Sequence, residues 1–513
     1  MRVPLTVNDF IDRAALVYGE RVGIVDEPEQ PAESLGELTY RQVHEYARAQ
    51  AAALDEHGIG QGERVAIVSQ NSARLLVSLF GVSGSGRVLV PINFRLNAEE
   101  VRYIVEHSGA SMLLVDPELD ESLRDVDAKY RYVIGAESDR EIFRFGADPE
   151  PWEPDEDATA TINYTSGTTA RPKGVQITHR NAWINTTTFG WQAGVNDRDV
   201  YLHTLPMFHC NGWGMPYAVT GMGGTHIVLR KVDGEEILTR MERHGVTLLC
   251  GAPAVVAAIL GAAEARAAEG RTVPGRGSVR MVVAGAPPPS KTIERIETEL
   301  GWEFIQIYGL TETAPLLTIN RRPAEWDALG AGERSQLLSR AGVPAMGVRI
   351  AIDTDGEVLA QSNHVFAGYW EQPDETAAAL EGGWFHTGDG GYLDGAYTVI
   401  ADRKKDVIIT GGENVSSIEV EDCLYQHGAV AEVAVIGVPD EKWGETIKAL
   451  VVVRDGTTTS EAELITHCRD RLAHFKAPTS IEFRDALDRT ATGKLQKYKL
   501  RQAYWAGREK SVN

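Results

Sequence analysis

Apolar and polar positions along the first 115 residues alternate between helical and strand-like patterns. Apolar side chains fall on one stripe of a helix that we expect over residues 39–56, and Thr39 and Gln42 have capping-box spacing at its start. Similar patterns predict strands at residues 65–68, 88–90 and 112–115 and helices at residues 71–80 and 97–107. Short, fully apolar strands that alternate with helices are typical of a parallel sheet in an α/β fold.

The rest of the chain first keeps this rhythm and then changes. A polar, proline-rich and acidic connector over residues 146–157 precedes the next strand. Beyond Asp402 the pattern of expected strands and helices changes. Further expected elements are strands at residues 160–163, 279–283, 303–307, 433–438 and 450–453 and a helix at residues 459–472. We therefore predict an α/β fold with a large N-terminal domain of parallel and mixed sheets with helices, residues 1–404, and a smaller, mobile α+β C-terminal domain, residues 405–513.

Charge and cysteine content narrow the class of protein. The chain has 513 residues, with 51 Lys and Arg against 73 Asp and Glu and a formal charge of −22, which argues against nucleic acid as a partner. The four cysteines form no CxxC pair, and the N-terminus carries charges where a signal peptide needs an apolar run. The longest weakly apolar run is too short to span a bilayer. We expect a cytoplasmic protein without integral membrane association; the sequence leaves a homodimer open.

A cluster of hydroxyl residues and glycines follows the strand expected at residues 160–163. The segment reads YTSGTTARPKG over residues 164–174. Backbone N–H groups of such a loop can converge on an anion, the hydroxyls add donors, and Lys173 supplies positive charge. It is not a Walker A loop, because Lys173 precedes Gly174 and no Ser or Thr follows. On composition alone, a flexible turn is the commoner meaning of such a stretch.

Seven further segments carry residues suited to nucleotide or acyl chemistry. They are LPMFHCNGW at 205–213, AGAP at 284–287, YGLTE at 308–312, TGD at 387–389, DRKKD at 402–406 and GGENVSS at 411–417, and a seventh, RTATGKL, lies at 489–495. An aromatic face suits a purine, and a carboxylate suits Mg²⁺. Most of these segments alone are commoner as an ordinary turn, a core pair or a surface residue, and the charged run at 402–406 is equally common on a solvated loop.

In this order, the segments resemble the motifs of the adenylate-forming, or AMP-binding, superfamily, in its acyl-CoA synthetase branch. Two positions depart from the usual pattern: Ala170 replaces a glycine, and Ser416-Ser417 replaces an aromatic-Pro pair. The resemblance implies ATP-binding roles for Thr165, Ser166, Gly167, Thr168, Thr169, Lys173, Gly285, Ala286, Pro287, Tyr308, Gly309, Asp389 and Arg403. It implies catalytic roles for Lys494, His209, Thr311 and Glu312, with Glu312 as the Mg²⁺ ligand and Lys405 at a hinge. It implies an acyl pocket of His209, Gly212, Trp213, Met215 and Ala284, and CoA contacts at Gly411, Gly412, Phe475 and Lys476.

The function implied by the resemblance is that of an ATP-dependent acyl-CoA synthetase, an acid–thiol ligase. A carboxylic acid is activated as an acyl-adenylate with release of pyrophosphate, and coenzyme A then forms the thioester with release of AMP. Medium-chain, aromatic and bulky cyclic acids are all open as substrates. A stand-alone adenylation enzyme that loads a carrier-protein phosphopantetheine shares every motif and is the alternative. A luciferase-like oxygenase and a non-catalytic nucleotide or acyl-adenylate binding protein are less favoured, because a sensor has no use for Lys494.

Overall fold

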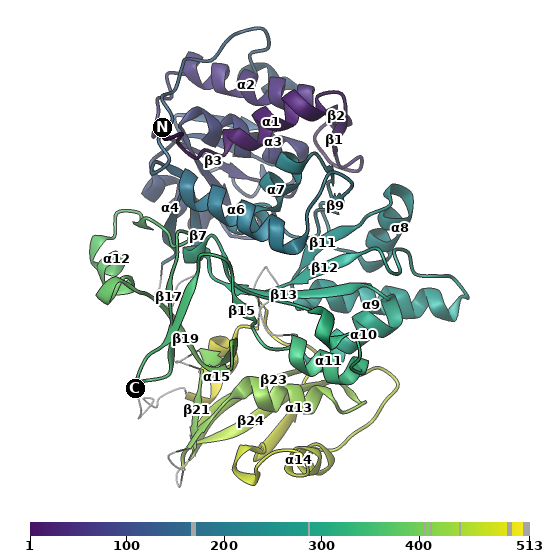
Figure 1. Ribbon diagram of the computed structural model, residues 1–513. Helices are drawn as coiled ribbons and strands as arrows, with labels where there is room; N and C mark the ends of the chain where they lie inside the picture. Colours follow the sequence, from purple (N-terminus) through teal and green to yellow (C-terminus); the bar gives the residue numbers. More distant parts are fainter. Residues whose placement is uncertain are drawn as a thin grey trace.

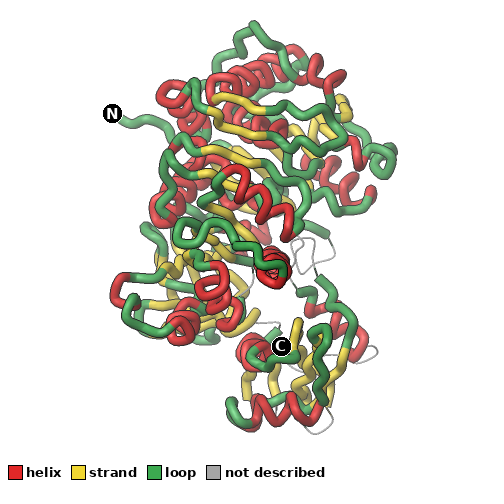
Figure 2. Tube along the Cα trace, turned by 90° about the vertical axis from the view of Figure 1, so that its right-hand side faces the viewer, coloured by secondary structure: helices red, strands yellow, loops and turns green. Residues whose placement is uncertain are grey.

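The structure is a computed structural model, which describes residues 1–165, 171–285, 288–403, 406–410, 413–440, 443–489 and 495–505, with Arg403 and Asn414 described by their backbone alone. A large N-terminal domain lies above a smaller C-terminal domain (Figure 1), and a view turned by 90° shows the same division (Figure 2). The two-domain α/β architecture expected from the sequence is confirmed. Within the described ranges, no helix is both long and apolar enough to cross a membrane.

A seven-stranded sheet organises the first part of the large domain, in the order β18-β8-β7-β4-β3-β5-β6. Its strands are β3 (Arg64–Val68), β4 (Val88–Ile92), β5 (Ala110–Val115), β6 (Tyr130–Val133), β7 (Thr159–Thr165), β8 (Lys173–Thr178) and β18 (Gly368–Tyr369). The helices of this region are α1 (Asn8–Tyr18), α2 (Tyr40–Glu56), α3 (Ala73–Gly81), α4 (Ala98–Ser108) and α5 (Ala136–Ile142). Strands β7, β4, β3, β5 and β6 run parallel, as the sequence pattern predicts.

Capping explains where two of the predicted helices begin. Thr39 accepts a hydrogen bond from the Gln42 backbone and Gln42 returns one, so α2 starts with the expected capping box. Asn97 and Glu100 do the same for α4.

A nine-stranded mixed sheet forms the second part of the large domain, in the order β15-β14-β13-β12-β11-β9-β10-β1-β2. Its strands are β1 (Val22–Val25), β2 (Glu37–Thr39), β9 (Val200–Leu202), β10 (Thr225–Ile227), β11 (Leu248–Gly251), β12 (Arg280–Val283), β13 (Glu303–Gly309), β14 (Leu316–Arg321) and β15 (Val343–Pro344). The accompanying helices are α6 (His179–Ala193), α7 (Met215–Met222), α8 (Gly234–His244), α9 (Pro253–Ala268), α10 (Ser290–Arg295) and α11 (Ala331–Leu338). The main apolar core of the molecule draws on both sheets.

A four-stranded antiparallel sheet precedes the small domain, where we expected strands that alternate with helices. It consists of β16 (Arg349–Ile352), β17 (Glu357–Gln361), β19 (Phe385–Asp394) and β20 (Tyr397–Arg403), with α12 (Pro373–Ala379) inserted. Asp-Gly pairs at residues 355–356 and 394–395 lie in the turns between successive strands. Asp-Gly favours tight hairpins, and hairpins produce antiparallel neighbours.

The small domain packs helices against a sheet of its own. Its strands are β21 (Ile408–Thr410), β22 (Glu413–Val415), β23 (Val430–Asp440), β24 (Gly444–Val453) and β25 (Ser480–Phe483), and its helices are α13 (Ser417–Tyr425), α14 (Glu461–Arg469) and α15 (Lys497–Trp505). A separate apolar cluster fills the space between them. The two domains touch where the Ser290 backbone N–H donates to Asp422 Oδ1 at 2.9 Å. The boundary expected at residues 404 and 405 lies outside the described residues and stays a prediction.

Candidate functional site

The predicted phosphate loop connects the two strands of a hairpin. Thr165 at the end of β7 pairs directly with Lys173 at the start of β8. The residues expected to contact phosphate between them lie outside the described ranges: Ser166, Gly167, Thr168 and Thr169. The structure therefore places both ends of the loop, and its phosphate contacts stay a prediction.

Lys173 and Glu312 are linked through an aromatic residue that the sequence analysis missed. The Lys173 Nζ lies 4.8 Å from the centre of the Tyr369 ring. The Tyr369 hydroxyl donates a 2.9 Å hydrogen bond to Glu312 Oε1. Burial, and then the neighbouring Glu312 carboxylate, raise the pKa of Tyr369 well above its ordinary value, so the phenol remains a donor. The available signal was the Gly-Tyr-Trp run at residues 368–370.

Tyr308 and Asp389 form a second contact between distant motifs. The Tyr308 hydroxyl donates a 2.8 Å hydrogen bond to Asp389 Oδ2. In the backbone ladder, Asp389 of β19 pairs with Arg403 of β20. A Cβ on Gly309 would lie 1.5 Å from the Pro315 carbonyl oxygen, so glycine is required beside Tyr308. An aromatic ring and a buried carboxylate thus come together, as the motifs predict.

The turn that carries Thr311 and Glu312 packs against a left-handed segment, Cys210–Gly214. Every residue of this segment has a positive φ, from 36° at Cys210 to 78° at Gly214. Left-handed backbone is uncommon outside glycine and costs free energy that the surroundings must offset. The Cys210 thiol lies 3.9 Å from the Thr311 carbonyl oxygen, its hydrogen-bond acceptor. This contact joins the predicted acyl-pocket segment to the Glu312 turn.

The residues predicted to line the acyl pocket differ in exposure. His209 is partly exposed and directly precedes the left-handed segment, in which Gly212 is buried. Trp213, Met215 and Ala284 are buried in the main apolar core. The structure thus brings these three side chains into one core cluster, and their contact with an acid stays a prediction.

Asn71 holds the chain that leads into this segment, and sequence reasoning did not single it out. Its Oδ1 accepts a 2.8 Å hydrogen bond from the Met207 backbone N–H. Its Nδ2 lies 3.0–3.1 Å from three backbone carbonyl oxygens, those of His203, Leu205 and Leu229. One amide therefore pairs with main chain on both sides of the left-handed segment. No local pattern reveals this, because the acceptors lie more than 130 residues away.

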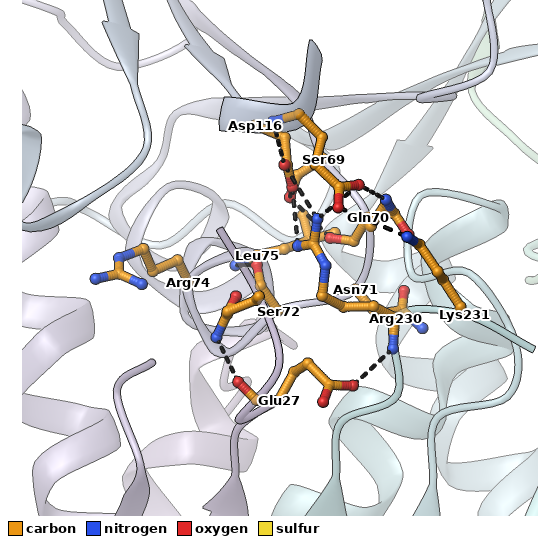
Figure 3. Close-up of polar contacts among 12 residues, drawn as sticks. Glu27, Ser69, Gln70, Asn71, Ser72, Arg74, Leu75, Asp116, Arg230 and Lys231 are labelled. Carbon is orange, nitrogen blue, oxygen red and sulfur yellow. Dashed lines mark hydrogen bonds and ion pairs between the residues drawn. The ribbon is translucent and has the colours of Figure 1, made fainter. Parts of the chain in front are cut away.

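A buried ion pair lies beside Asn71 and joins the two large sheets (Figure 3). The Arg230 guanidinium donates to both oxygens of Asp116, at 3.0 and 3.1 Å. The Ser69 hydroxyl also donates to Asp116, at 2.9 Å, and Glu27 accepts from the Arg230 backbone at 3.2 Å. Asp116 follows β5 of the seven-stranded sheet and Arg230 follows β10 of the nine-stranded sheet. The pair therefore fixes the relative position of the sheets on which the site is built.

The remaining predicted residues are divided between described and undescribed parts of the chain. Gly285 has φ +97°, which favours glycine. On the small domain, Phe475 is exposed, and the Lys476 Nζ lies 2.7 Å from Glu419 Oε2 in an ion pair. The predicted residues outside the described ranges are Ala286, Pro287, Lys405, Gly411, Gly412 and Lys494.

The donor set at Glu312 fits a magnesium ion that arrives with a nucleotide. Among the described residues, no group of three or more His, Cys, Asp or Glu side chains could hold a metal ion. Mg²⁺ in nucleotide sites takes one or two carboxylates and completes its shell with water and phosphate oxygens. A single carboxylate, oriented by the Tyr369 hydroxyl, is consistent with that requirement.

Comparisons with known proteins agree over almost the whole chain. Residues 7–370 match the AMP-binding enzyme family, and residues 419–494 match the AMP-binding enzyme C-terminal domain. The chain is 36% identical to 2-methylpropanoate–CoA ligase of Humulus lupulus, over 97% of this chain and 95% of that protein. It is also 36% identical to 4-hydroxybutyrate–CoA ligase 2 of Metallosphaera sedula, over 97% and 94% respectively.

A solved structure shows the same architecture. The o-succinylbenzoate CoA synthetase of Bacillus subtilis, in complex with its acyl-adenylate intermediate, aligns with a TM-score of 0.81 at 28% identity, covering 96% of this chain and 98% of that one. Fold, motif geometry and sequence similarity therefore lead to one conclusion: the chain belongs to the AMP-binding enzyme family.

Proposed function

We propose that the protein is an AMP-forming acyl-CoA synthetase that activates a short carboxylic acid and transfers it to coenzyme A. The observation that carries the proposal is the link from Lys173 through Tyr369 to Glu312. It joins a cation of the phosphate-loop hairpin to a carboxylate suited to Mg²⁺. This combination serves ATP phosphates, whose charge must be neutralised before an anionic carboxylate can approach.

The first half-reaction joins two anions and releases one. A substrate carboxylate oxygen attacks the α-phosphorus of ATP, the bond to the β-phosphate oxygen breaks, and pyrophosphate leaves. Lys494 is proposed to neutralise the carboxylate and the α-phosphate, and Lys173 with the 165–169 loop to hold the β and γ phosphates. Glu312 would hold Mg²⁺, and the ion would supply further neutralisation of phosphate charge.

The nucleoside is proposed to bind at the Tyr308–Asp389 contact. An adenine ring can lie against the Tyr308 ring, and the Asp389 carboxylate, oriented by the Tyr308 hydroxyl, can accept hydrogen bonds from ribose hydroxyls. Arg403 is proposed as a second ribose contact. In the second half-reaction the CoA thiol attacks the acyl carbon and AMP leaves, with Gly411, Gly412, Phe475 and Lys476 as the proposed CoA contacts and Lys405 as the hinge.

A short aliphatic acid is the substrate class that we favour. Trp213 and Met215, two of the residues proposed to line the acyl pocket, are buried in the main apolar core, and we propose that their bulk limits the pocket to a short chain. Two relatives are named for four-carbon acids, 2-methylpropanoate and 4-hydroxybutyrate. We also propose a cytoplasmic location, although two relatives are named as peroxisomal.

Pyrophosphate release across a panel of acids, with and without CoA, tests the proposal. Short acids are expected to give pyrophosphate, and CoA is expected to give acyl-CoA and sustained AMP formation. Glu312→Gln should slow pyrophosphate release about 100-fold, whereas Glu333→Gln, on the exposed face of α11, should not change it. Transfer to a carrier-protein phosphopantetheine but not to free CoA would contradict the proposal.

A further inference from the structure

A small cavity with both polar and apolar walls lies behind the Glu312 turn, between helix α6, strand β7 and the left-handed segment Cys210–Gly214. Its volume is about 10 Å³, enough for about one water-sized group. Its polar wall includes Asn163 from β7, Asn185 and Thr186 from α6, Asn211 from the left-handed segment, and Tyr217 from α7. No charged side chain among the described residues lines it, so the cavity suits a neutral group.

Four polar atoms of this wall have no hydrogen-bond partner among the described residues, and all four residues are at most 5% exposed. They are Asn163 Oδ1, Asn185 Nδ2, Thr186 Oγ1 and Asn211 Oδ1. Buried polar atoms are normally paired, and each unpaired one costs about 1–3 kcal/mol. Four such atoms around one cavity indicate a site that is completed by a ligand.

The position of Gly214 shows that two of these atoms converge. A Cβ built on Gly214 would lie 2.8 Å from Asn185 Nδ2 and 3.2 Å from Thr186 Oγ1. Both atoms therefore reach the same point of the wall, and a glycine keeps that point open. Thr161 orients the other two amides, because the Nδ2 groups of Asn163 and Asn211 both donate to its Oγ1, at 2.9 and 3.1 Å.

A hydroxyl is the smallest neutral group that matches this arrangement. It can accept hydrogen bonds from Asn185 Nδ2 and Thr186 Oγ1 and donate one to an asparagine Oδ1. A methyl group of similar size would leave all of these atoms unpaired. The cavity should therefore separate a hydroxyl from a methyl much more strongly than an apolar pocket could.

The cavity is adjacent to the proposed reaction site. Cys210 and Ala314 both line it. The Cys210 thiol contacts the Thr311 carbonyl oxygen, and Ala314 directly follows the turn Thr311–Thr313. A short acid whose carboxylate lies near this turn can place its far end in the cavity.

We propose that the cavity binds the hydroxyl group of a short hydroxy acid, which makes such acids the preferred substrates. The proposal rests on the proposed function, since it names the substrate class of that enzyme. Asn163, Asn185, Thr186 and Asn211 are then specificity-determining residues rather than parts of a purely structural cluster.

The experiment compares ω-hydroxy acids of two to six carbons with the matched acids in which a methyl replaces the hydroxyl. The kcat/KM for CoA-dependent AMP formation is measured for each pair. At one chain length the hydroxy acid should be preferred about tenfold or more. Thr186→Val has the same shape without the hydroxyl and should lower that preference about fivefold, while thermal unfolding confirms that the variant folds.

Thr187→Val is the matched control, because it lies on the same helix and its hydroxyl donates to the Trp183 backbone carbonyl at 3.1 Å. It should keep the wild-type preference. Two results would overturn the proposal and show that the cavity holds water alone. In the first, the enzyme prefers the methyl acid at every chain length; in the second, Thr186→Val leaves the preference for the hydroxy acid unchanged. Absence of CoA-dependent AMP formation with every acid would instead contradict the proposed function itself.

Discussion

The Asn71 cluster consists of Asn71 and the neighbouring Glu27, Ser69, Asp116 and Arg230. It and the cavity beside Thr186 are both buried and both contain polar side chains, but they differ in how their polar atoms are paired. Asn71 uses its amide oxygen and nitrogen on four backbone groups, and Asp116 receives four hydrogen bonds. At the cavity, four side-chain atoms have no partner among the described residues. Paired groups in a low-dielectric interior hold the chain, whereas unpaired ones favour a ligand that completes them.

The two regions also differ in what they connect. The Asn71 cluster joins the seven-stranded and nine-stranded sheets. One of its buried atoms, Arg230 Nε, has no hydrogen-bond partner among the described residues. The cavity is lined by Ala314, which directly follows the turn Thr311–Thr313, and no charged side chain of the described ranges lines it. Removing polar groups should therefore reduce stability in the first region and change specificity in the second.

The largest expected effect comes from breaking the buried ion pair. Asp116→Leu leaves the Arg230 guanidinium, 4% exposed, without its main partner, and should lower the free energy of unfolding by about 3–5 kcal/mol. Urea unfolding measures this loss. The double variant Asp116→Leu with Arg230→Met removes the uncompensated charge and should recover part of the lost free energy of unfolding. If Asp116→Leu alone stays within 1 kcal/mol of the wild type, the pair does not join the sheets.

Asn71→Leu should have the next largest effect. It leaves the Met207 N–H and several carbonyl oxygens unpaired, which should lower the free energy of unfolding by about 2–3 kcal/mol. Activity should fall as well, because the segment that leads to His209 loses its anchor. Asn93→Leu is the control, because Asn93 is partly exposed and its Oδ1 accepts a single hydrogen bond among the described residues, from the Arg95 backbone at 3.1 Å. It should cost less than 1 kcal/mol, and equal losses in both variants would remove the distinction.

Tyr369→Phe should have a smaller effect, confined to activity. The variant keeps the ring beside Lys173 but removes the hydrogen bond to Glu312, a change of about 1 kcal/mol or fivefold in kcat/KM for ATP. Tyr392→Phe, on an exposed ring of β19, provides the comparison. A kcat/KM equal to that of the wild type would mean that Tyr369 does not orient the carboxylate.

Thr186→Val should have the smallest effect on stability. Its hydroxyl has no partner among the described residues, so replacing it with a methyl group of similar size should leave the free energy of unfolding within about 0.5 kcal/mol or raise it. Urea unfolding measured beside Asn71→Leu makes the comparison direct. A loss above 1 kcal/mol would show that the hydroxyl is paired and that the cavity is part of the packing.

Local sequence patterns predicted those features that depend on neighbouring residues. Capping boxes mark the starts of α2 and α4. The motif of Asp389 lies beside Tyr308, and the motif of Glu312 lies near Lys173, as expected. The apolar alternation of strands could not separate parallel from antiparallel neighbours, so the four-stranded sheet before Asp402 was missed.

The features that the sequence did not predict depend on contacts across the fold. Tyr369 meets Glu312 only because β18 pairs with β8, and Asn71 acts on chain more than 130 residues away. The cavity could not be predicted either, because its unpaired atoms come from three separate segments. Neither helical periodicity nor motif spacing reports on which side-chain atoms lack a partner.

Transfer of an ¹⁸O label tests the central claim most directly. The acid is labelled in its carboxylate and incubated with the enzyme, ATP, Mg²⁺ and CoA, and the products are analysed by mass spectrometry. Attack of the carboxylate on the α-phosphorus predicts AMP that carries one ¹⁸O atom for each acyl-CoA formed. Unlabelled AMP, or label in inorganic phosphate together with ADP, would contradict an acyl-adenylate and with it the function proposed for this protein.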